Sequence, residues 1–145
     1  MDEKLDHGDI LAQEEFSGLP WPPKESELQS SLAKVGGRML AEIIPKYIRG
    51  EITPIPQDHD QATFTKKIGK EDGLLDLSDD AEKNFRKIQA FDIWPRSYFF
   101  HESRGKKIRV IVTDAELKNK TLLIKRVLPE GQKEMEYEEF LRRNP

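Results

Sequence analysis

The pattern of apolar and polar residues predicts a long helix in the first half of the chain. Apolar side chains recur at steps of three and four between Leu28 and Tyr47, which places them on one face that must bury against something. Ser26 fits the N-cap position and Gly50 fits the terminator. Pro45 lacks a backbone donor and predicts a kink or an early end. The apolar face consists of Leu28, Leu32, Val35, Met39, Ile43 and Tyr47.

The residues around this helix indicate a strand before it and a packing partner beside it. Leu5–Asp9 is expected to be a tight turn, because Gly8 adopts positive φ without steric cost. Ile10–Phe16 is expected to be a strand. The Gly36-Gly37 pair in mid-helix costs on the order of 1 kcal/mol per glycine relative to alanine, which predicts close approach of a neighbouring backbone.

The second half of the chain predicts several strands and two shorter helices. Residues 51–62 contain Pro54 and Pro56 and no helical period, so they are expected to form an extended connector. Among the later elements, one helix starts at Ser78 and buries Ala81, Phe85 and Ile88. The elements expected beyond the connector are a strand at 72–77, a helix at 78–91, strands at 96–101, 106–113 and 121–127, and a helix near 136–141.

Two short turn sequences predict hairpins among these strands. They are Arg104-Gly105-Lys106 and Lys118-Asn119-Lys120. The β-branched residues in Ile108–Val112 suit a sheet. At least one of the three aromatic residues at 98–100 is expected to face solvent, since they follow one another along a strand.

Composition narrows the class to a soluble globular protein. Hydrophobic residues make up 36% and charged residues 35% of the chain, enough for a modest core under a charged surface. No apolar run approaches the roughly 18 to 20 residues of a bilayer span, and the start is acidic where a signal peptide is basic, so we expect a cytoplasmic protein without membrane contact. The chain has no cysteine, and His7 with Asp9, or Asp58-His59-Asp60, offers too few ligands for a metal.

Basic residues concentrate in the second half, although the net charge is −3. Between residues 96 and 126 they outnumber the acidic residues, so this stretch could meet a polyanion. The alternative is a solvated β-surface whose charges keep the protein in solution. The basic residues of the stretch are Arg96, Arg104, Lys106, Lys107, Arg109, Lys118, Lys120, Lys125 and Arg126.

Several segments, in the same order over nearly the whole chain, resemble the methionyl-tRNA formyltransferase family. The turn Leu5-Asp6-His7-Gly8 is similar to the family's Leu-Asp-x-Gly active-site turn, although His7 departs from the threonine common there. Phe91-Asp-Ile-Trp-Pro95 is similar to its Phe-Asn-Pro-Trp-Pro signature. The matching segments are 1–13, Ile52–Asp58 (the interdomain linker), Ala62–Ile68, Phe91–Pro95, and Pro129–Met135 with Phe140–Arg142.

The resemblance implies an α+β fold in two parts. Residues 1–56 would be the end of a Rossmann-like catalytic domain, a strand plus a helix, and residues 57–145 an OB-like β-barrel domain with one helix that holds tRNA. Little more than a turn separates the stretches matching Ile108–Leu117 and Leu122–Val127, where the family usually has an additional hairpin, so we expect a reduced or open barrel. The orphan first part is expected to be poorly ordered or to self-associate through its helix.

The resemblance also implies the reaction and its residues. The family transfers formyl from 10-formyltetrahydrofolate to the methionyl amino group of initiator tRNA. Asp6 would relay protons from the attacking amine, with Leu5 and Gly8 at the folate-binding edge. The family's Asn-x-His pair is absent, because no asparagine here is followed two positions later by histidine, so the chain alone is expected to be inactive. From the residues alone, Asp6 and Asp9 could simply shape a turn.

For tRNA, the resemblance points to basic side chains whose phosphate contacts would give salt-dependent affinity. Trp94 is expected in the core, with stacking on a base as the alternative. The tRNA-binding candidates are Lys66, Lys67, Arg96, Arg104, Lys106, Lys107 and Arg109.

Two other functions compete with this interpretation. One is a standalone RNA-binding module that has lost its enzyme. The other is a piece of a formyltransferase that acts on an amino sugar and shares the aspartate turn. The match at Phe91–Pro95 and at the C-terminus argues against the amino-sugar enzyme.

Overall fold

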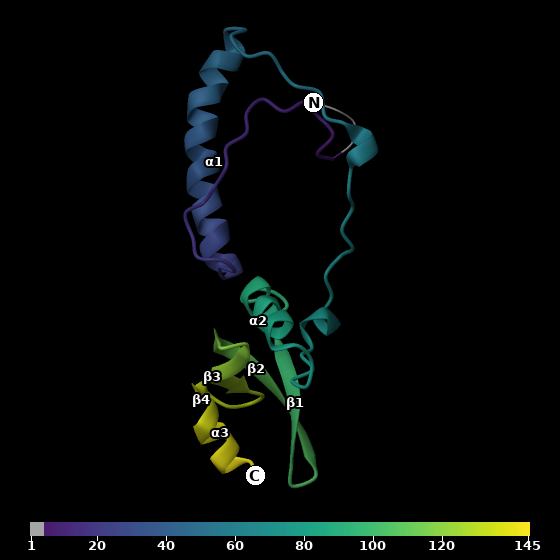
Figure 1. The fold of residues 1–145 in the computed structure, drawn as a ribbon, viewed down its shortest axis with the longest axis vertical. Coiled ribbons are helices and arrows are strands. Elements are labelled where there is room, and N and C mark those ends of the chain that lie inside the picture. The colour runs from purple at the N-terminus through teal and green to yellow at the C-terminus, as the bar shows by residue number, and fades with distance from the viewer. Residues whose placement is uncertain (1–4) are drawn as a thin grey trace. The chain divides into compact units, whose positions relative to one another are not determined.

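The computed structural model describes residues 5–145. Over that range it is an α+β structure with three α-helices and a four-stranded antiparallel sheet (Figure 1). The chain separates into two compact units: Gln29–Lys67 with the residues up to Gly18, and Ile68–Pro145 with Leu19–Leu28. The elements are α1 (Glu25–Ile48), α2 (Ala81–Ala90), β1 (Tyr98–Ser103), β2 (Lys106–Lys118), β3 (Thr121–Pro129), β4 (Met135–Glu136) and α3 (Tyr137–Arg143).

The C-terminal end of α1 is closed by Gly50, as predicted. Gly50 has a φ of +72°, and the N–H of Glu51 donates to the carbonyl of Lys46 at 3.0 Å, which is the bond that ends a helix with a left-handed residue. The helix continues past Pro45 to Ile48. The predicted early end is therefore wrong, because a proline in the last turn removes only one helical hydrogen bond.

The start and the apolar face of α1 differ from the prediction. The helix begins at Glu25, so Ser26 lies in its first turn, where it donates to the Asp92 carboxylate instead of capping. No residue of α1 is buried, and Tyr47 of the apolar face is 50% exposed. A Cβ added at either member of the Gly36-Gly37 pair would meet nothing within 4 Å, so the close approach predicted there is wrong.

The segment predicted as a strand at 10–16 forms a single bridge. Ile10 and Ile55 exchange backbone hydrogen bonds of 2.8 and 3.0 Å, and the described residues show no longer ladder there. A strand needs a continuous partner, and the connector 51–62 cannot supply one because its prolines lack donors. The connector is otherwise extended as predicted, apart from a short 3₁₀ turn at His59–Gln61.

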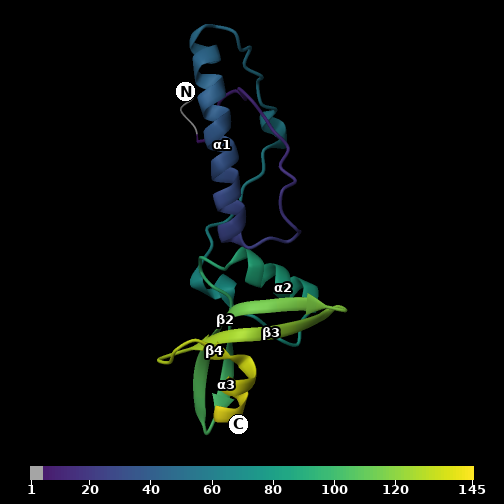
Figure 2. The same cartoon turned by 90° about the vertical axis from the view of Figure 1, so that its left-hand side faces the viewer.

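The four strands of the second unit form a meander in the order β1-β2-β3-β4 (Figure 2). Arg104-Gly105 joins β1 to β2 and Asn119-Lys120 joins β2 to β3, and all four residues have φ between +50° and +73°. Such two-residue turns match the right-handed twist of the strands, so both predicted hairpins are confirmed. The order leaves β1 and β4 at the edges, so the described sheet is open and does not confirm a closed barrel.

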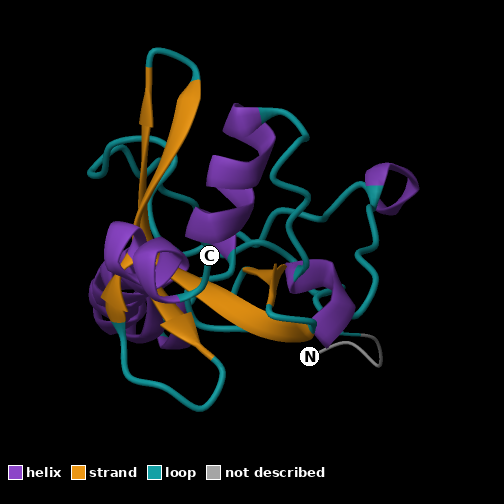
Figure 3. Ribbon diagram, turned by 90° about the horizontal axis from the view of Figure 1, so that it is seen from below, coloured by secondary structure: helices purple, strands orange, loops and turns teal. Residues whose placement is uncertain are grey.

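The core covers one face of the twisted sheet seen in Figure 3. Val110, Val127 and Phe140 are completely buried there. Ile88 of α2 and Leu75, which precede the sheet in the sequence, belong to the same core. Among the aromatic residues at 98–100 the first two are buried and the third is 43% exposed, which confirms that one of them faces solvent.

A β-bulge carries β2 well beyond its predicted end at residue 113. The register with β3 shifts between Val112 and Ala115. Before the bulge, Val110 and Val112 face the core; after it, Ala115 lies opposite Ile124, and both pack against the core. Because of the inserted residue, the side chains that face the core have even numbers before the bulge and odd numbers after it. The alternation of apolar and polar residues therefore changes phase in the sequence although the strand continues.

Helix α2 begins later than predicted. Its N-cap is Asp80, not Ser78, because the Asp80 carboxylate accepts a backbone N–H of the first turn at 2.7 Å. Ile88 is buried as predicted, whereas Ala81 and Phe85 are only half-buried. The inward face of α2 is therefore correct and its start is shifted.

The strand predicted at 72–77 is wrong. Lys70–Gly73 form a 3₁₀ helix, and the Asp72 carboxylate accepts the backbone N–H of Gly69 at 2.8 Å. Aspartate favours such local bonds over strand pairing. Only Leu74 makes a bridge, to Tyr98.

The Glu134 carboxylate next to β2 provides a test of the local electrostatics. The hydroxyl of Thr113 donates to Glu134 at 2.6 Å and the guanidinium of Arg126 at 3.3 Å, and these contacts hold the pKa of Glu134 below its ordinary value. The pKa of Glu134 is lower in the folded state than in the unfolded state. The stabilisation of the folded state by this carboxylate is therefore present at neutral pH and is lost as the pH falls through the folded-state pKa.

Thr113→Val is therefore expected to raise the pKa of Glu134 toward its ordinary value. A carbon-detected NMR titration of the Glu134 side chain measures the change. Thr121→Val, at an exposed position of β3, is the control and should leave that pKa unchanged. An equal response to both variants would contradict the assigned role of the Thr113 hydroxyl.

Candidate functional site

The turn that contains Asp6 is held by the connector of the same unit. Asp6 has a φ of +56°, in the left-handed region, and its side chain is exposed. The side-chain amide of Gln57 donates to the carbonyl oxygens of Asp6, at 3.0 Å, and of Gly8, at 2.6 Å. The imidazole ring of His7 stacks on that of His59, with 3.4 Å between centroids and 8° between planes.

These residues surround a cavity of about 460 Å³ within the first unit. Leu5 and Asp6 are among its lining residues. Gly8 is not, but its carbonyl oxygen accepts the hydrogen bond from Gln57 that holds the turn. The opposite wall comes from connector residues between Gln57 and Phe64. A carboxylate at such a cavity can accept a hydrogen bond or a proton from an amine, which is the chemistry expected of Asp6.

The sequence did not predict the contacts made by Gln57 and His59. The matching linker segment, Ile52–Asp58, was the available signal, because it ends at the residues that touch the turn. Across residues 5–145 no group of three or more His, Asp or Glu side chains is arranged to hold a metal ion. In the same range no helix is long and apolar enough to cross a membrane.

The basic candidates fall into separate places. Lys66 and Lys67 lie at the end of the first unit, after the connector, and Arg96 precedes β1 in the second unit. Arg104 is in the β1–β2 turn and Lys106 starts β2. The structure thus does not bring all seven candidates to one surface of the second unit.

Two of the candidates, Lys107 and Arg109, share a face with aromatic side chains. Lys107 Nζ lies 4.4 Å from the ring centroid of Phe100, and the Arg109 guanidinium carbon lies 4.0 Å from that of Tyr98. Phe100 and Arg109 are also directly opposite each other on β1 and β2. Among the described residues neither cation forms an ion pair, so both charges are available to an anion. We call Tyr98, Phe100, Lys107 and Arg109 the basic-aromatic face.

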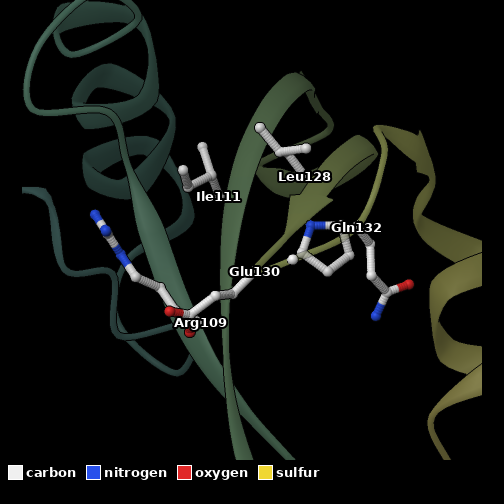
Figure 4. Close-up of a pocket in the computed structure, with 7 residues that line it drawn as sticks. Arg109, Ile111, Leu128, Glu130 and Gln132 are labelled. Carbon is white, nitrogen blue, oxygen red and sulfur yellow. The ribbon is translucent and has the colours of Figure 1, made fainter.

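A small hollow of about 190 Å³ adjoins the basic-aromatic face (Figure 4). Arg109, Ile111 and Leu128 line it from the sheet, and the loop after β3 closes it. The Nε atom of Arg109 is buried without a hydrogen-bond partner in the described structure. This donor is therefore unsatisfied, and in this conformation it is closed off from a ligand.

At the other end of the basic stretch, two of the basic side chains form ion pairs within the second unit. Arg126 pairs with Glu134 and Glu136, and Lys125 pairs with Glu116 at 3.3 Å. The solvated-surface alternative therefore fits the far end of the sheet, and the polyanion interpretation fits the β1–β2 hairpin. Trp94 is 52% exposed, so its predicted place in the core is wrong.

Comparison with known proteins first defines the class. Residues 67–121, which include α2, β1 and β2, match the family model described as the formyl transferase C-terminal domain. This stretch of the chain therefore belongs to the formyl transferase C-terminal domain family.

Individual relatives show which formyltransferases the chain resembles. The chain is 41% identical to methionyl-tRNA formyltransferase of Chloroflexus aurantiacus over 111 residues, which are 77% of this chain and 35% of the relative. It is 32% identical to the same enzyme of Carboxydothermus hydrogenoformans over 163 aligned positions, covering 97% of this chain and 52% of the relative. The chain is thus homologous to the C-terminal part of methionyl-tRNA formyltransferases and spans about a third to a half of their length.

Proposed function

We propose that the chain is the C-terminal part of an enzyme that transfers formyl from 10-formyltetrahydrofolate to the methionyl amino group of initiator tRNA. The homology to methionyl-tRNA formyltransferases carries this proposal. Asp6 is the proton relay, and its place at a cavity lined by polar groups supports that role. Leu5 and Gly8 form one edge of the folate site in this proposal. The relatives bear the name of the tRNA enzyme, so the amino-sugar enzyme is not proposed.

In this proposal residues 1–56 are the end of the catalytic domain and residues 57–145 are the tRNA-binding domain. The open meander of β1 to β4 would be a reduced form of an OB-like barrel. The alignment with the Carboxydothermus relative covers more positions than the 145 residues present here, so that relative has additional residues. A cytoplasmic location and self-association through the exposed face of α1 stay predictions; sedimentation at increasing concentration tests the latter.

The proposed tRNA surface is the basic-aromatic face. Its two unpaired cations supply phosphate contacts, and its exposed Phe100 supplies a ring on which a base can stack. Arg104 and Lys106 extend the same hairpin. Arg96, Lys66 and Lys67 stay separate predictions for tRNA contacts, because they lie outside this hairpin.

Changing Lys107 and Arg109 together to alanine is expected to weaken binding of initiator tRNA and to reduce the slope of log affinity against log salt by about two. Fluorescence anisotropy at several salt concentrations measures both quantities. The matched control is Lys118→Ala with Lys125→Ala, which removes the same charge from the last residue of β2 and the middle of β3. Equal losses in both double variants would show a diffuse charge effect and exclude a defined surface.

The chain alone is expected to transfer no formyl group, because the Asn-x-His pair of the family is not in it. A formyl-transfer assay with 10-formyltetrahydrofolate and methionyl-tRNA checks this. Turnover by the pure chain would overturn our assignment of the missing chemistry to residues outside it.

A standalone RNA-binding module is the second candidate, favoured by the same basic-aromatic face. The two candidates differ in coding context: a reading frame that continues upstream through an Asn-x-His motif supports the enzyme.

A further inference from the structure

The contacts between the connector and the Asp6 turn are more extensive than a linker requires. Within five residues, the connector makes the backbone bridge at Ile55, the double donation from Gln57 and the ring stack from His59. All of them reach the short segment from Asp6 to Ile10. The connector therefore does more than link two segments of the chain. It also restrains the conformation of the Asp6 turn.

The turn needs such support, because Asp6 is left-handed. A residue with a Cβ pays a steric penalty in that region, smaller for aspartate than for most residues, so hydrogen bonds from outside the turn stabilise this conformation. The carbonyl groups on either side of His7 converge on one amide nitrogen, that of Gln57. A primary amide has two N–H groups and can serve both oxygens at once, whereas a carboxylate can serve neither.

We infer that Gln57 is a positioning residue that fixes the backbone around Asp6, assisted by the stacking of His59 on His7. This inference rests on the proposed role of Asp6. It assigns the segment that joins the two parts of the enzyme a second task, which is to set the direction in which the Asp6 carboxylate leaves the backbone. Movement of the connector would then be felt directly at the catalytic turn.

The test uses the chain itself and NMR. Gln57→Glu keeps the size of the side chain but removes both donors, so amide hydrogen exchange at Ile10 and Ile55 is expected to accelerate roughly tenfold. Gln57→Lys restores donors and is expected to retain most of the protection. Gln13→Glu, the same chemical change at an exposed position of the first unit, is the control and should leave exchange unchanged.

A second measurement follows the ring stack. His59→Ala should remove the ring-current shift of the His7 ring protons, and His59→Phe should preserve a shift from a stacked ring. Unchanged exchange in Gln57→Glu, or equal loss in Gln57→Lys, would overturn the inference. No formyl transfer is measured in these experiments, so their failure is distinct from failure of the proposed function, which the transfer and tRNA assays decide.

Discussion

Replacing Phe140 by alanine is expected to lower the free energy of unfolding of the second unit by about 3 to 5 kcal/mol. The Phe140 side chain is completely buried and stacks edge-on against His101, at 5.0 Å between centroids. Helix α3 has only seven residues, too few to be stable without tertiary contacts. Loss of its one fully buried side chain should release the helix from the sheet.

Urea unfolding followed by tryptophan fluorescence measures this loss, because Trp21 and Trp94 both belong to the second unit. Leu141→Ala is the matched control: it removes an apolar side chain from the same helix at a position that is 40% exposed. Its cost should be well under half that of Phe140→Ala. Similar midpoints for the two variants would mean that α3 contributes little to the stability of the sheet.

The second large effect is expected at Gly73, where alanine should destabilise the unit by about 1 to 3 kcal/mol. Gly73 is buried, and a Cβ there would lie 2.4 Å from the backbone carbonyl oxygen of Arg96. A backbone oxygen cannot rotate away as a side chain can. The segment before β1 would have to shift, and with it the bridge between Leu74 and Tyr98.

Two other glycines provide controls for the Gly73 variant. At Gly69 the three atoms nearest to a Cβ belong to the flexible side chain of Glu71, so alanine should cost little. At Gly36 it would meet nothing, and alanine should stabilise α1 by up to about 1 kcal/mol. Thermal unfolding monitored by fluorescence and circular dichroism separates these cases. A Gly73→Ala protein as stable as the Gly69→Ala protein would contradict the steric argument.

Much of the second unit could be predicted from the sequence, because its elements are determined locally. The two-residue turns at Arg104-Gly105 and Asn119-Lys120 are marked by residue type, and the inward face of α2 follows helical spacing. The length of β2 could not be predicted. The alternation of apolar and polar residues in β2 breaks at Asp114. A break of this kind could mark a turn or a bulge, and only the pairing with β3 shows that it is a bulge.

The first unit was predicted less well for a different reason. Ile10–Phe16 was expected to be a strand, but a strand forms only where another supplies its hydrogen bonds, and among the described residues only Ile55 does so. In the candidate site too, the local feature could be predicted and the long-range contact could not. The position of Asp6 in a turn could be predicted from Leu5–Asp9. The hydrogen bonds from Gln57 to that turn join residues far apart in the sequence, so no local pattern indicates them.

The Asn119-Lys120 turn restricts how this end of the sheet can vary in evolution. Two residues are the shortest common link between antiparallel strands, so the turn offers almost nothing to delete. Growth that keeps this turn type must come in pairs that lengthen both strands together. A single added residue would change the turn type or slip one strand against the other, exposing apolar side chains such as Ile124 while burying charged neighbours.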